Sequence, residues 1–477
     1  MTTSAKSDRI NIVGAGVFGL STAIHLADRG YTNVVVFDRN DYEKTLYSYT
    51  KGCDAASADI NKIIRSAYGS QTLYQNLAFD AIKAWDEWND ELRNDPAAAP
   101  PGMSSKDVLW INNGDLSVTD DDVLGDFEKA TIQNMERLGY QNTQLANNIP
   151  AHLELAARKG FASRLQPFQK NLLGVMDTTG GVVLADKACR FALHKAKRLG
   201  VQFVLSREAG KVIRLLERAD NTVIGLETAD GKAHYASMTI MAGGAWTPTL
   251  VPSLDRIAEA TAGSVLMFRL PENSPLRERF SPQNFPAWSF RIGDGADHGL
   301  YGFPVDEHGI LKLGYRGSKF TNPRTQADGI ERSVPVTRWT ETEQIREIPL
   351  QAMRVIQKFI DEYLPELSCL PVWATRLCWY TDSFDNQYVI DRVPTKPGLF
   401  VATAGSGHAF KFLPTIGSWV ADIVEGVGLD REAVRSWRWR SLPEGGRATN
   451  SLMEGSQGPR ALKNIALWDA EQLRANL

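Results

Sequence analysis

Cysteine and long apolar segments are both scarce in this sequence. The 477 residues include four cysteines, at positions 53, 189, 369 and 378, with no CxxC pair and no spacing typical of metal ligands. We therefore expect reduced thiols and no bound metal. No apolar run approaches the roughly 18 residues that span a bilayer, so we expect no membrane partner. No secretory leader precedes the first predicted strand, which favours an intracellular location.

The sequence also lacks a strong excess of charge of either sign. A formal net charge of -3 produces no field that would attract nucleic acid or an anionic membrane, so we expect no nucleic-acid partner. The composition, 43% hydrophobic and 23% charged, is that of an ordinary globular protein. The chain exceeds the length at which single cores stop growing, and two domains are therefore the default expectation.

The N-terminal residues have the pattern of a dinucleotide-binding fold. A β-branched run at 9–13 is followed by the turn GAGVFG (14–19) and by a segment, 20–30, with apolar residues at helical spacing. A second apolar run at 34–37 ends in Asp38. The glycines let the backbone approach a pyrophosphate at the helix N-terminus, where unpaired N–H groups favour negative charge. A carboxylate at position 38 suits the ribose hydroxyls.

Two later strands also end in glycine-rich turns. Residues 238–242 lead into Gly-Gly-Ala-Trp at 243–246, and residues 399–403 lead into Ala-Gly-Ser-Gly-His at 404–408. Such strands, far apart in the sequence, indicate one nucleotide sheet assembled from separate segments. This arrangement favours FAD, because NAD enzymes normally continue with regular βαβ units. An NAD-dependent dehydrogenase remains an alternative that rests on the first motif alone.

Several segments occur in the order and with the residues of a known family. They are GAGVFG with Asp38, NKIIRSAYG (61–69), AGGAW (242–246), LKLGY (311–315), CWYTDSFDNQYVID (378–391) and GSGHAFKF (405–412). Together they resemble the FAD-dependent amine oxidases that include monomeric sarcosine oxidase, pipecolate oxidase, saccharopine oxidase and the fructosyl amino acid oxidases (amadoriases). SWRWR (436–440) is similar to the amadoriase tail.

The resemblance implies an α/β fold of the glutathione-reductase-like, D-amino-acid-oxidase type. We expect a discontinuous Rossmann-like FAD-binding domain in residues 1–90, 176–262 and 370–445. A mixed-sheet α+β substrate domain is expected in residues 91–175 and 263–369. Residues 446–477 would form a C-terminal tail, and we expect a monomer. The first of the two substrate-domain segments matches the family poorly and is expected to build the substrate cavity.

The segment GILKLGYRG (309–317) alternates as a strand, with Lys312, Gly314 and Arg316 on one face. A single lysine in a strand is usually a solvated edge charge. The resemblance implies instead that Lys312 lies over the flavin and activates O₂. A fixed cation within ~4 Å stabilises the negative charge that develops on O₂ by ~4 kcal/mol at an effective dielectric constant near 20, or about three decades of rate.

The segment RLCWYTDS (376–383) places a cysteine within an aromatic strand. Free cysteine usually packs in the core as a small hydrophobe. Strand alternation puts Arg376, Cys378 and Tyr380 on a common face. The resemblance implies that Cys378 carries FAD through its 8-methyl group and that Tyr380 lines the substrate cavity. The neighbouring guanidinium would favour the thiolate that such an attachment needs.

The segment GSGHAFKF precedes an apolar helix that we expect to begin near Pro414. Backbone N–H groups near Gly405 and Gly407 are suited to the flavin pyrimidine edge. Lys411 resembles the family lysine near that edge and would stabilise the negative charge that the reduced ring gains. His408 is either a structural histidine at a strand end or a cofactor contact, and both interpretations stay open.

Two cationic positions bear on the substrate. Lys62 and Arg65 fall in a predicted helical turn, and the amadoriases have lysine where Lys62 stands, whereas sarcosine oxidase has arginine. Arg316 replaces a histidine of sarcosine oxidase, so sarcosine oxidation itself is not expected. Its guanidinium could pair with a substrate carboxylate, or its stem could pack while its head stays in water.

The expected site combines these motifs with their neighbours. The cofactor contacts are Gly14, Gly16, Val17, Phe18, Gly19, Asp38, Arg39, Ser57, Lys62, Val212, Gly243, Trp246, Cys378, Gly405, Gly407, His408 and Lys411. The catalytic residues are Lys62, Lys312, Arg316, Tyr380 and Lys411.

These expectations describe a flavoprotein oxidase that converts the secondary amine of an N-substituted amino acid to an imine and reduces O₂ to hydrogen peroxide. The candidate substrates are glycated amino acids, saccharopine or pipecolate, and N-methylated amino acids or related biosynthetic amines. A flavin-binding protein without turnover is a further alternative. The C-terminal Ala-Asn-Leu loosely resembles the peroxisomal address Ser-Lys-Leu, so the expected location is cytoplasmic or peroxisomal.

Overall fold

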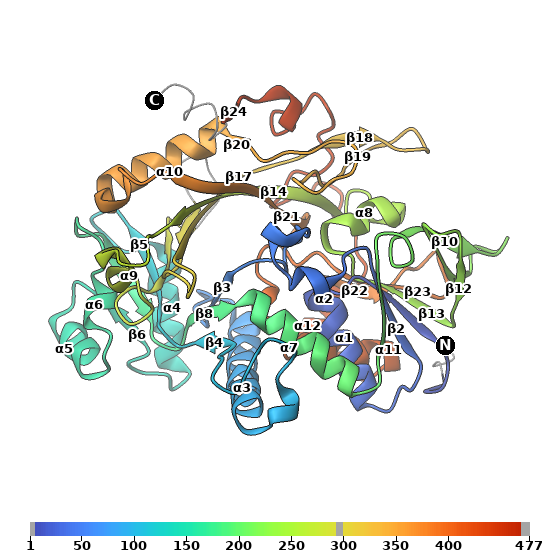
Figure 1. Ribbon diagram of the computed structural model, residues 1–477, viewed down its shortest axis with the longest axis horizontal. Helices are drawn as coiled ribbons and strands as arrows, with labels where there is room; N and C mark the ends of the chain where they lie inside the picture. Colours follow the sequence, from blue (N-terminus) through green and yellow to red (C-terminus); the bar gives the residue numbers. More distant parts are fainter. Residues whose placement is uncertain (1–4, 292–298, 469–477) are drawn as a thin grey trace.

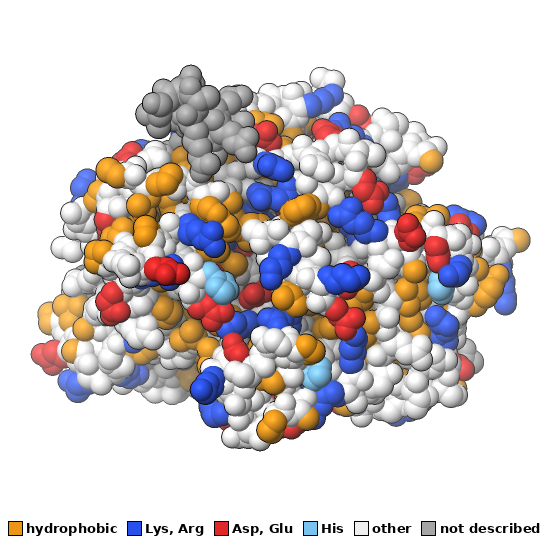
Figure 2. All heavy atoms as spheres, in the orientation of Figure 1, with side chains coloured by type: hydrophobic (Ala, Val, Ile, Leu, Met, Phe, Trp, Pro, Cys, Tyr) orange, Lys and Arg blue, Asp and Glu red, His pale blue; other side chains and the backbone are white. Residues whose placement is uncertain are grey.

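The computed structural model describes residues 5–291 and 299–468, and two large sheets dominate it (Figure 1). The C-terminal Ala-Asn-Leu lies outside the described residues. No helix in the described part of the chain is long and apolar enough to cross a membrane. Acidic and basic side chains are interspersed over the face shown in Figure 2.

A six-stranded sheet, on the right in Figure 1, forms around the N-terminal strand. In spatial order its strands are β22 (Val389–Arg392), β23 (Leu399–Thr403), β13 (Met238–Met241), β1 (Ile10–Val13), β2 (Val34–Asp38) and β9 (Gln202–Leu205). All pairs are parallel except the antiparallel pair of β22 and β23. The predicted assembly of one nucleotide sheet from distant segments is confirmed.

The central strands of this sheet are buried on both faces, as expected for parallel strands covered by helices. Helix α1 (Val17–Asp28) follows the first glycine-rich turn and packs against α7 (Ala185–Arg198) and α11 (Ile416–Glu425). A Cβ atom added to Gly417 would lie 2.0 Å from the Ser21 carbonyl oxygen. The absence of that atom lets α11 approach the α1 backbone closely.

A mixed eight-stranded sheet forms the other half of the molecule. In spatial order its strands are β21 (Val372–Ser383), β14 (Ala258–Arg269), β17 (Ile310–Phe320), β16 (Leu300–Gly302), β15 (Ala287–Phe290), β5 (Asp115–Thr119), β7 (Leu173–Asp177) and β6 (Gln144–Ala146). Only the pair of β15 and β5 is parallel in this sheet as described. Helix α10 (Leu350–Tyr363) packs its apolar side on β17, so that Ile356 and Phe359 join one core with Leu313.

Shorter elements complete the chain. The remaining strands are β3 (Asn61–Ile64), β4 (Trp110–Ile111), β8 (Gly181–Leu184), β10 (Val212–Glu217), β11 (Val223–Thr228), β12 (Ala233–Tyr235), β18 (Pro323–Thr325), β19 (Glu331–Ser333), β20 (Ile348–Pro349) and β24 (Leu467–Trp468). The remaining α-helices are α2 (Tyr42–Thr45), α3 (Thr72–Asn94), α4 (Asp126–Arg137), α5 (Pro150–Arg158), α6 (Ala162–Leu165), α8 (Thr247–Leu250), α9 (Pro275–Arg279) and α12 (Glu432–Trp437). Short 3₁₀ turns include η3 (Gly244–Trp246) and η6 (Phe410–Phe412).

The predicted helical turn at Lys62 is wrong. Residues Asn61–Ile64 form strand β3, which pairs antiparallel with β8 so that Lys62 lies opposite Val183. The two β-branched isoleucines that follow Lys62 favour an extended strand once a partner strand is available. That partner lies more than a hundred residues away and is invisible in the local pattern.

The predicted domain boundaries remain a proposal, and two strands bear on them. Strand β21, which the boundary at residue 370 assigns to the FAD-binding domain, pairs with β14 along its length. Strand β14 begins at Ala258, four residues before the boundary at 262. We propose to assign both whole strands to the substrate domain, because together with β17 they form its central sheet.

Candidate functional site

A cavity of about 280 Å³ lies where the three glycine-rich turns meet. The turns follow β1, β13 and β23, and the parallel pairing of these strands brings their carboxyl ends to one edge of the sheet. Ligands of open α/β sheets bind at such an edge. The lining also includes residues from β21, which closes the cavity from the side of the eight-stranded sheet.

The start of helix α1 forms one wall of the cavity. Gly16 is the N-cap residue and provides no side-chain cap, while the Ser57 hydroxyl accepts a hydrogen bond from the Val17 N–H at 3.1 Å. The first turn of a helix carries N–H groups without intrahelical partners and the positive end of the helix dipole, so it favours a phosphate group. Gly14 has φ +106°, and a Cβ there would lie 2.4 Å from the Ala242 carbonyl oxygen, so only glycine fits this turn.

Asp38 stands at the end of β2 beside this wall. Its two carboxylate oxygens accept the backbone N–H groups of Ala15 and Asn40, at 2.9 and 2.8 Å. Burial raises the pKa of Asp38, although these hydrogen bonds oppose the shift. Oδ1 also accepts a hydrogen bond from Asn40 Nδ2 at 3.2 Å, so it is Oδ2 that keeps a further lone pair for a ribose hydroxyl. Nearby, the Arg39 guanidinium lies over the Trp246 ring, 4.6 Å from its centroid.

The cavity fits FAD by the polar groups it offers. Thr381 and Thr403 are among the lining residues, and their hydroxyls are buried without a hydrogen-bond partner among the described residues. Buried polar groups are normally paired, so a polar ligand bound here would give these hydroxyls partners. An anion-binding helix start, a carboxylate suited to ribose and unpaired hydroxyls in one cavity match the parts of a dinucleotide.

Most of the expected cofactor contacts line the cavity. They are Gly14, Gly16, Val17, Phe18, Asp38, Arg39, Ser57, Lys62, Val212, Gly243, Trp246, Gly405, Gly407 and His408, and the expected catalytic Tyr380 joins them. Gly19 lies behind the turn, where an added Cβ would be 1.8 Å from the Gly14 carbonyl oxygen, so it serves close helix–strand packing. Cys378, Lys312, Lys411 and Arg316 lie outside this lining.

Lys312 and Cys378 lie on the same face of the eight-stranded sheet. Gly314 on β17 and Arg376 on β21 both lie opposite Val265 of the intervening strand β14, which fixes the register of the two outer strands. Alternation then puts Lys312, Cys378 and Tyr380 on this face. Lys312 and Cys378 are both about 1% exposed, and Tyr380 lines the cavity.

A buried ion network underlies this face. The Asp59 carboxylate oxygen Oδ2 lies 2.6 Å from Lys62 Nζ and 2.9 Å from Lys312 Nζ. Arg376 pairs with Asp54 at 2.7 Å. Burial lowers the pKa of Lys312 to about 7, although Asp59 opposes the shift. Burial alone would raise the pKa of Asp59, but its cationic neighbours hold it well below the usual range.

A second cationic group surrounds Tyr68. Lys411 Nζ donates a hydrogen bond to the Tyr68 hydroxyl at 2.8 Å, and Arg65 lies 5.5 Å from the centroid of the same ring. Burial and Arg65 hold the pKa of Lys411 well below its usual value. Burial raises the pKa of Asp115 to about 7, and its Oδ1 has no hydrogen-bond partner in the described part of the chain. The predicted site omitted Arg65 and Asp115, although the NKIIR motif contains the former.

Arg316 contacts the turn that carries His408. A Cβ atom added to Gly407, which has φ +74°, would lie 3.1 Å from Arg316 Nη1. The guanidinium therefore lies against the glycine-rich turn that lines the cavity. This position agrees with either of the two interpretations given for Arg316, a carboxylate contact or a packed stem.

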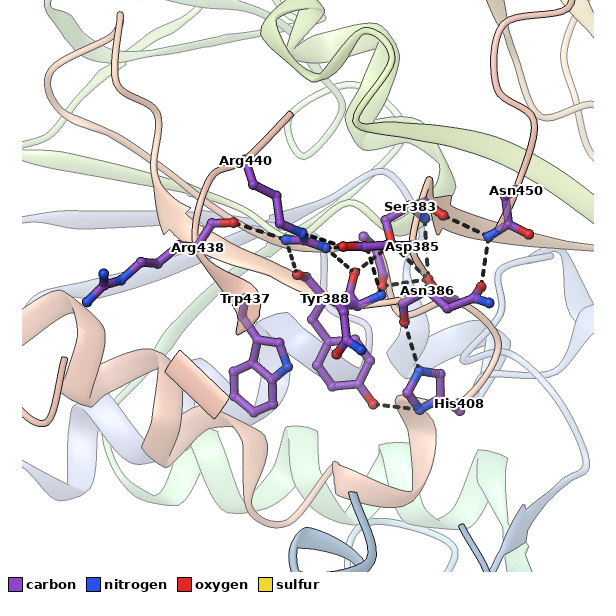
Figure 3. Close-up of polar contacts among 12 residues, drawn as sticks. Ser383, Asp385, Asn386, Tyr388, His408, Trp437, Arg438, Arg440 and Asn450 are labelled. Carbon is purple, nitrogen blue, oxygen red and sulfur yellow. Dashed lines mark hydrogen bonds and ion pairs between the residues drawn. The ribbon is translucent and has the colours of Figure 1, made fainter. Parts of the chain in front are cut away.

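His408 has structural partners on both ring nitrogens (Figure 3). Nδ1 lies 3.2 Å from the Tyr388 hydroxyl, and Nε2 lies 3.2 Å from the Asn386 carbonyl oxygen. Burial, assisted by the Lys411 cation, lowers the pKa of His408 to about 3, so the ring is neutral near pH 7. These contacts support the structural interpretation, while the residue also lines the cavity.

The SWRWR motif holds the loop that supports His408 (Figure 3). Arg440 donates to both carboxylate oxygens of Asp385, at 2.7 and 2.6 Å, and to the Tyr388 carbonyl oxygen at 2.9 Å. Asn450 donates to the Ser383 carbonyl oxygen at 2.7 Å. The C-terminal segment therefore fastens the loop between β21 and β22.

Residues 9–423 match the family described as DAO, FAD dependent oxidoreductase. The chain belongs to this family. The match confirms the expected FAD-dependent α/β fold of D-amino-acid-oxidase type and excludes the NAD-dependent alternative.

Relatives of this FAD-dependent oxidoreductase cover nearly the whole chain. L-saccharopine oxidase of Schizosaccharomyces pombe is 28% identical over 91% of this chain and 93% of its own length. Human peroxisomal sarcosine oxidase is 23% identical over 85% of this chain and 89% of its own. The crystal structure of the deglycating fructosamine oxidase amadoriase II from Aspergillus fumigatus has a TM-score of 0.74 at 26% identity and covers 98% of both chains.

Proposed function

We propose that this FAD-dependent oxidoreductase oxidises the C–N bond of a secondary amine in an N-substituted amino acid, with O₂ as the electron acceptor. One observation carries the proposal: Lys312, Cys378 and Tyr380 share the sheet face that meets the glycine-lined cavity. The names of the saccharopine, sarcosine and fructosamine oxidases among its relatives support the same reaction class.

We assign the cofactor contacts to the cavity residues and to Cys378, which lies outside the cavity lining. The start of α1 would hold the pyrophosphate, Asp38 the ribose and Cys378 Sγ a covalent link to the flavin. Formation of that C–S bond would remove one hydrogen from the thiol and one from the methyl carbon, and O₂ would take up the two electrons released. When bound, FAD accepts a hydride equivalent from the amine and passes the electrons to O₂, which becomes hydrogen peroxide.

Lys312 and Lys411 supply the charge that the reaction needs. Protonated Lys312 would stabilise the negative charge that develops on O₂, by ~4 kcal/mol at about 4 Å. Lys411 would stabilise the charge that the cofactor gains at its pyrimidine edge. The cations around the site would also lower the pKa of the substrate amine, so that the neutral amine reacts and no strong base is required.

Three cations are available for the substrate carboxylates. Lys411 and Arg65 flank Tyr68, and Arg316 lies against the glycine-rich turn. A guanidinium binds a carboxylate through two parallel hydrogen bonds. This supply of cations supports a substrate with at least one free carboxylate beside the secondary amine, and we assign Arg316 to that carboxylate.

A hydrogen-peroxide assay with purified protein tests the proposal. The panel is saccharopine, pipecolate, fructosyl-valine and an N-methyl amino acid, with a primary amino acid as control. We expect peroxide from saccharopine or the glycated amino acid, with the N-methyl amino acid as the alternative. A protein that binds FAD but produces no peroxide from any secondary amine would be the non-catalytic alternative and would refute the proposal.

A further inference from the structure

Asp59 is the only carboxylate in the described structure that forms ion pairs with both Lys62 and Lys312. Its Oδ2 lies 2.6 Å from Lys62 Nζ and 2.9 Å from Lys312 Nζ, and its Oδ1 lies 3.7 Å from Arg376. The three cations come from β3, β17 and β21. The Asp59 side chain is 2% exposed and that of Lys312 is 1% exposed, so water cannot replace either partner.

The other described contacts of Lys312 are uncharged, so the protonation state of Lys312 depends on the Asp59 carboxylate. Lys312 Nζ also donates to the Asn61 carbonyl oxygen at 2.7 Å and lies 4.3 Å from the Phe303 ring centroid. These neutral contacts favour a cation but supply no full negative charge. The titratable and charged groups that face the Asp59–Lys312 pair are Lys62 from β3, Arg376 and Cys378 from β21, Tyr301 from β16, Tyr49, and Asp54, which pairs with Arg376.

Burial of a lysine disfavours its protonated form, while a nearby carboxylate favours it. Lys62 acts in the opposite direction, because a second cation on the same carboxylate disfavours protonation of Lys312. The charge of Lys312 is therefore set by a balance between Asp59 and Lys62. Asp59 also belongs to the segment that carries Ser57 and Lys62, both of which line the cavity.

We propose that Asp59 is the positioning residue of the O₂ step. Asp59 keeps Lys312 protonated and holds it on the sheet face that carries Cys378 and Tyr380, and it shares its negative charge between Lys312 and Lys62. The inference rests on the proposed function, because Asp59 acts through the lysine assigned to O₂. A purely structural role would instead be to fasten the cavity segment to the sheet.

The test follows the pH profile of flavin reoxidation by O₂ in the substrate-reduced holoenzyme. In Asp59→Asn, Lys312 loses its counter-charge, so we expect the midpoint above which reoxidation slows to move down by about one pH unit or more. In Lys62→Met, Lys312 no longer shares Asp59, so we expect the midpoint to move up. Opposite shifts are not expected from a fastening role. Unchanged midpoints or shifts in the same direction would overturn the inference.

A matched control and a rescue variant separate the effect of the Asp59 charge from the effect of disturbing the local structure. Asp382→Asn removes another buried carboxylate, 2.6 Å from buried Lys319 and on the same sheet, and should leave the midpoint in place. Asp59→Glu keeps the charge and should restore a midpoint close to that of the unchanged enzyme. If Asp59→Asn does not retain FAD, the direction of the Lys62→Met shift decides the outcome.

A double variant makes the failures distinguishable. In a Lys312→Met background, Asp59→Asn should have no further effect on the pH profile, because the two residues act as a unit. If Lys312→Met leaves reoxidation unchanged, the assigned role of Lys312 fails. If it slows reoxidation and the two effects are additive, only the inference about Asp59 fails.

Discussion

At the scale of single residues, neighbours decide what a buried cysteine can do. Cys53, Cys189 and Cys378 are all buried. Burial raises the pKa of Cys53 to about 12 and that of Cys189 well above its usual range, which makes both thiols inert. Cys378 instead lies on the sheet face that also carries Lys312 and Arg376.

Replacement of Cys378 tests the covalent link. Acid precipitation of the unchanged protein should leave the yellow flavin in the pellet, whereas Cys378→Ala should release it into the supernatant. Cys189→Ala is the matched control, because it removes an equally buried thiol and should leave the flavin bound. Retention of the flavin in the Cys378→Ala pellet would show that the attachment lies elsewhere.

Replacement of Lys312 tests its role with O₂. Lys312→Met should slow reoxidation by up to about three decades, because the cation that stabilises the developing charge is lost. Reduction by substrate under anaerobic conditions should slow far less. Since burial lowers the pKa of Lys312 to about 7, the cationic fraction falls as pH rises through that value. Reoxidation by the unchanged enzyme should therefore slow above about pH 7, and equal slowing of both half-reactions in Lys312→Met would contradict the assignment.

At the scale of elements, the periodicity of the sequence predicted the helices and strands whose pattern is complete within a short segment. The unit of β1, α1 and β2 and the alternation along β17 and β21 could be predicted, because each pattern is complete within a short segment. Strand β3 could not, because its pairing with β8 joins residues near 62 and 183. The pairing of Asp59 with Lys312 was also hidden, since register and tertiary packing, not sequence spacing, bring positions 59 and 312 together.

The loop between β21 and β22 depends on the C-terminal segment for its position. Arg440→Ala should leave the half-buried Asp385 without its two charge-assisted hydrogen bonds, at a cost of about 2 kcal/mol. We expect a lower thermal midpoint and weaker noncovalent FAD retention when combined with Cys378→Ala. Arg438→Ala is the control, because Arg438 donates to a single backbone carbonyl, that of Leu429. Equal thermal midpoints for the two variants would show that the hydrogen bonds from Arg440 to Asp385 do not hold the loop.

At the scale of the whole molecule, the cavity is lined by residues from the glycine-rich turns, from β21 and from the segment that carries Ser57. The exposed large hydrophobic side chains include Val123, Tyr235 and Val427, which belong to separate parts of the sequence. We therefore expect a monomer. Light scattering of the holoenzyme should give a mass close to 52.8 kDa, independent of protein concentration. A mass twice as large, with activity lost on dilution, would contradict this prediction.

The order of strands in the six-stranded sheet has a consequence for synthesis on the ribosome. β1 pairs with β13, which begins at Met238, and β13 pairs with β23, which begins at Leu399. Chains rich in such distant pairings fold slowly, since long loops must close before the contacts form. The N-terminal βαβ unit emerges early but lacks two of the three turns that form the cavity. The cofactor can therefore be loaded only after translation has passed residue 408, and a covalent link to it would mark chains that reached the folded state.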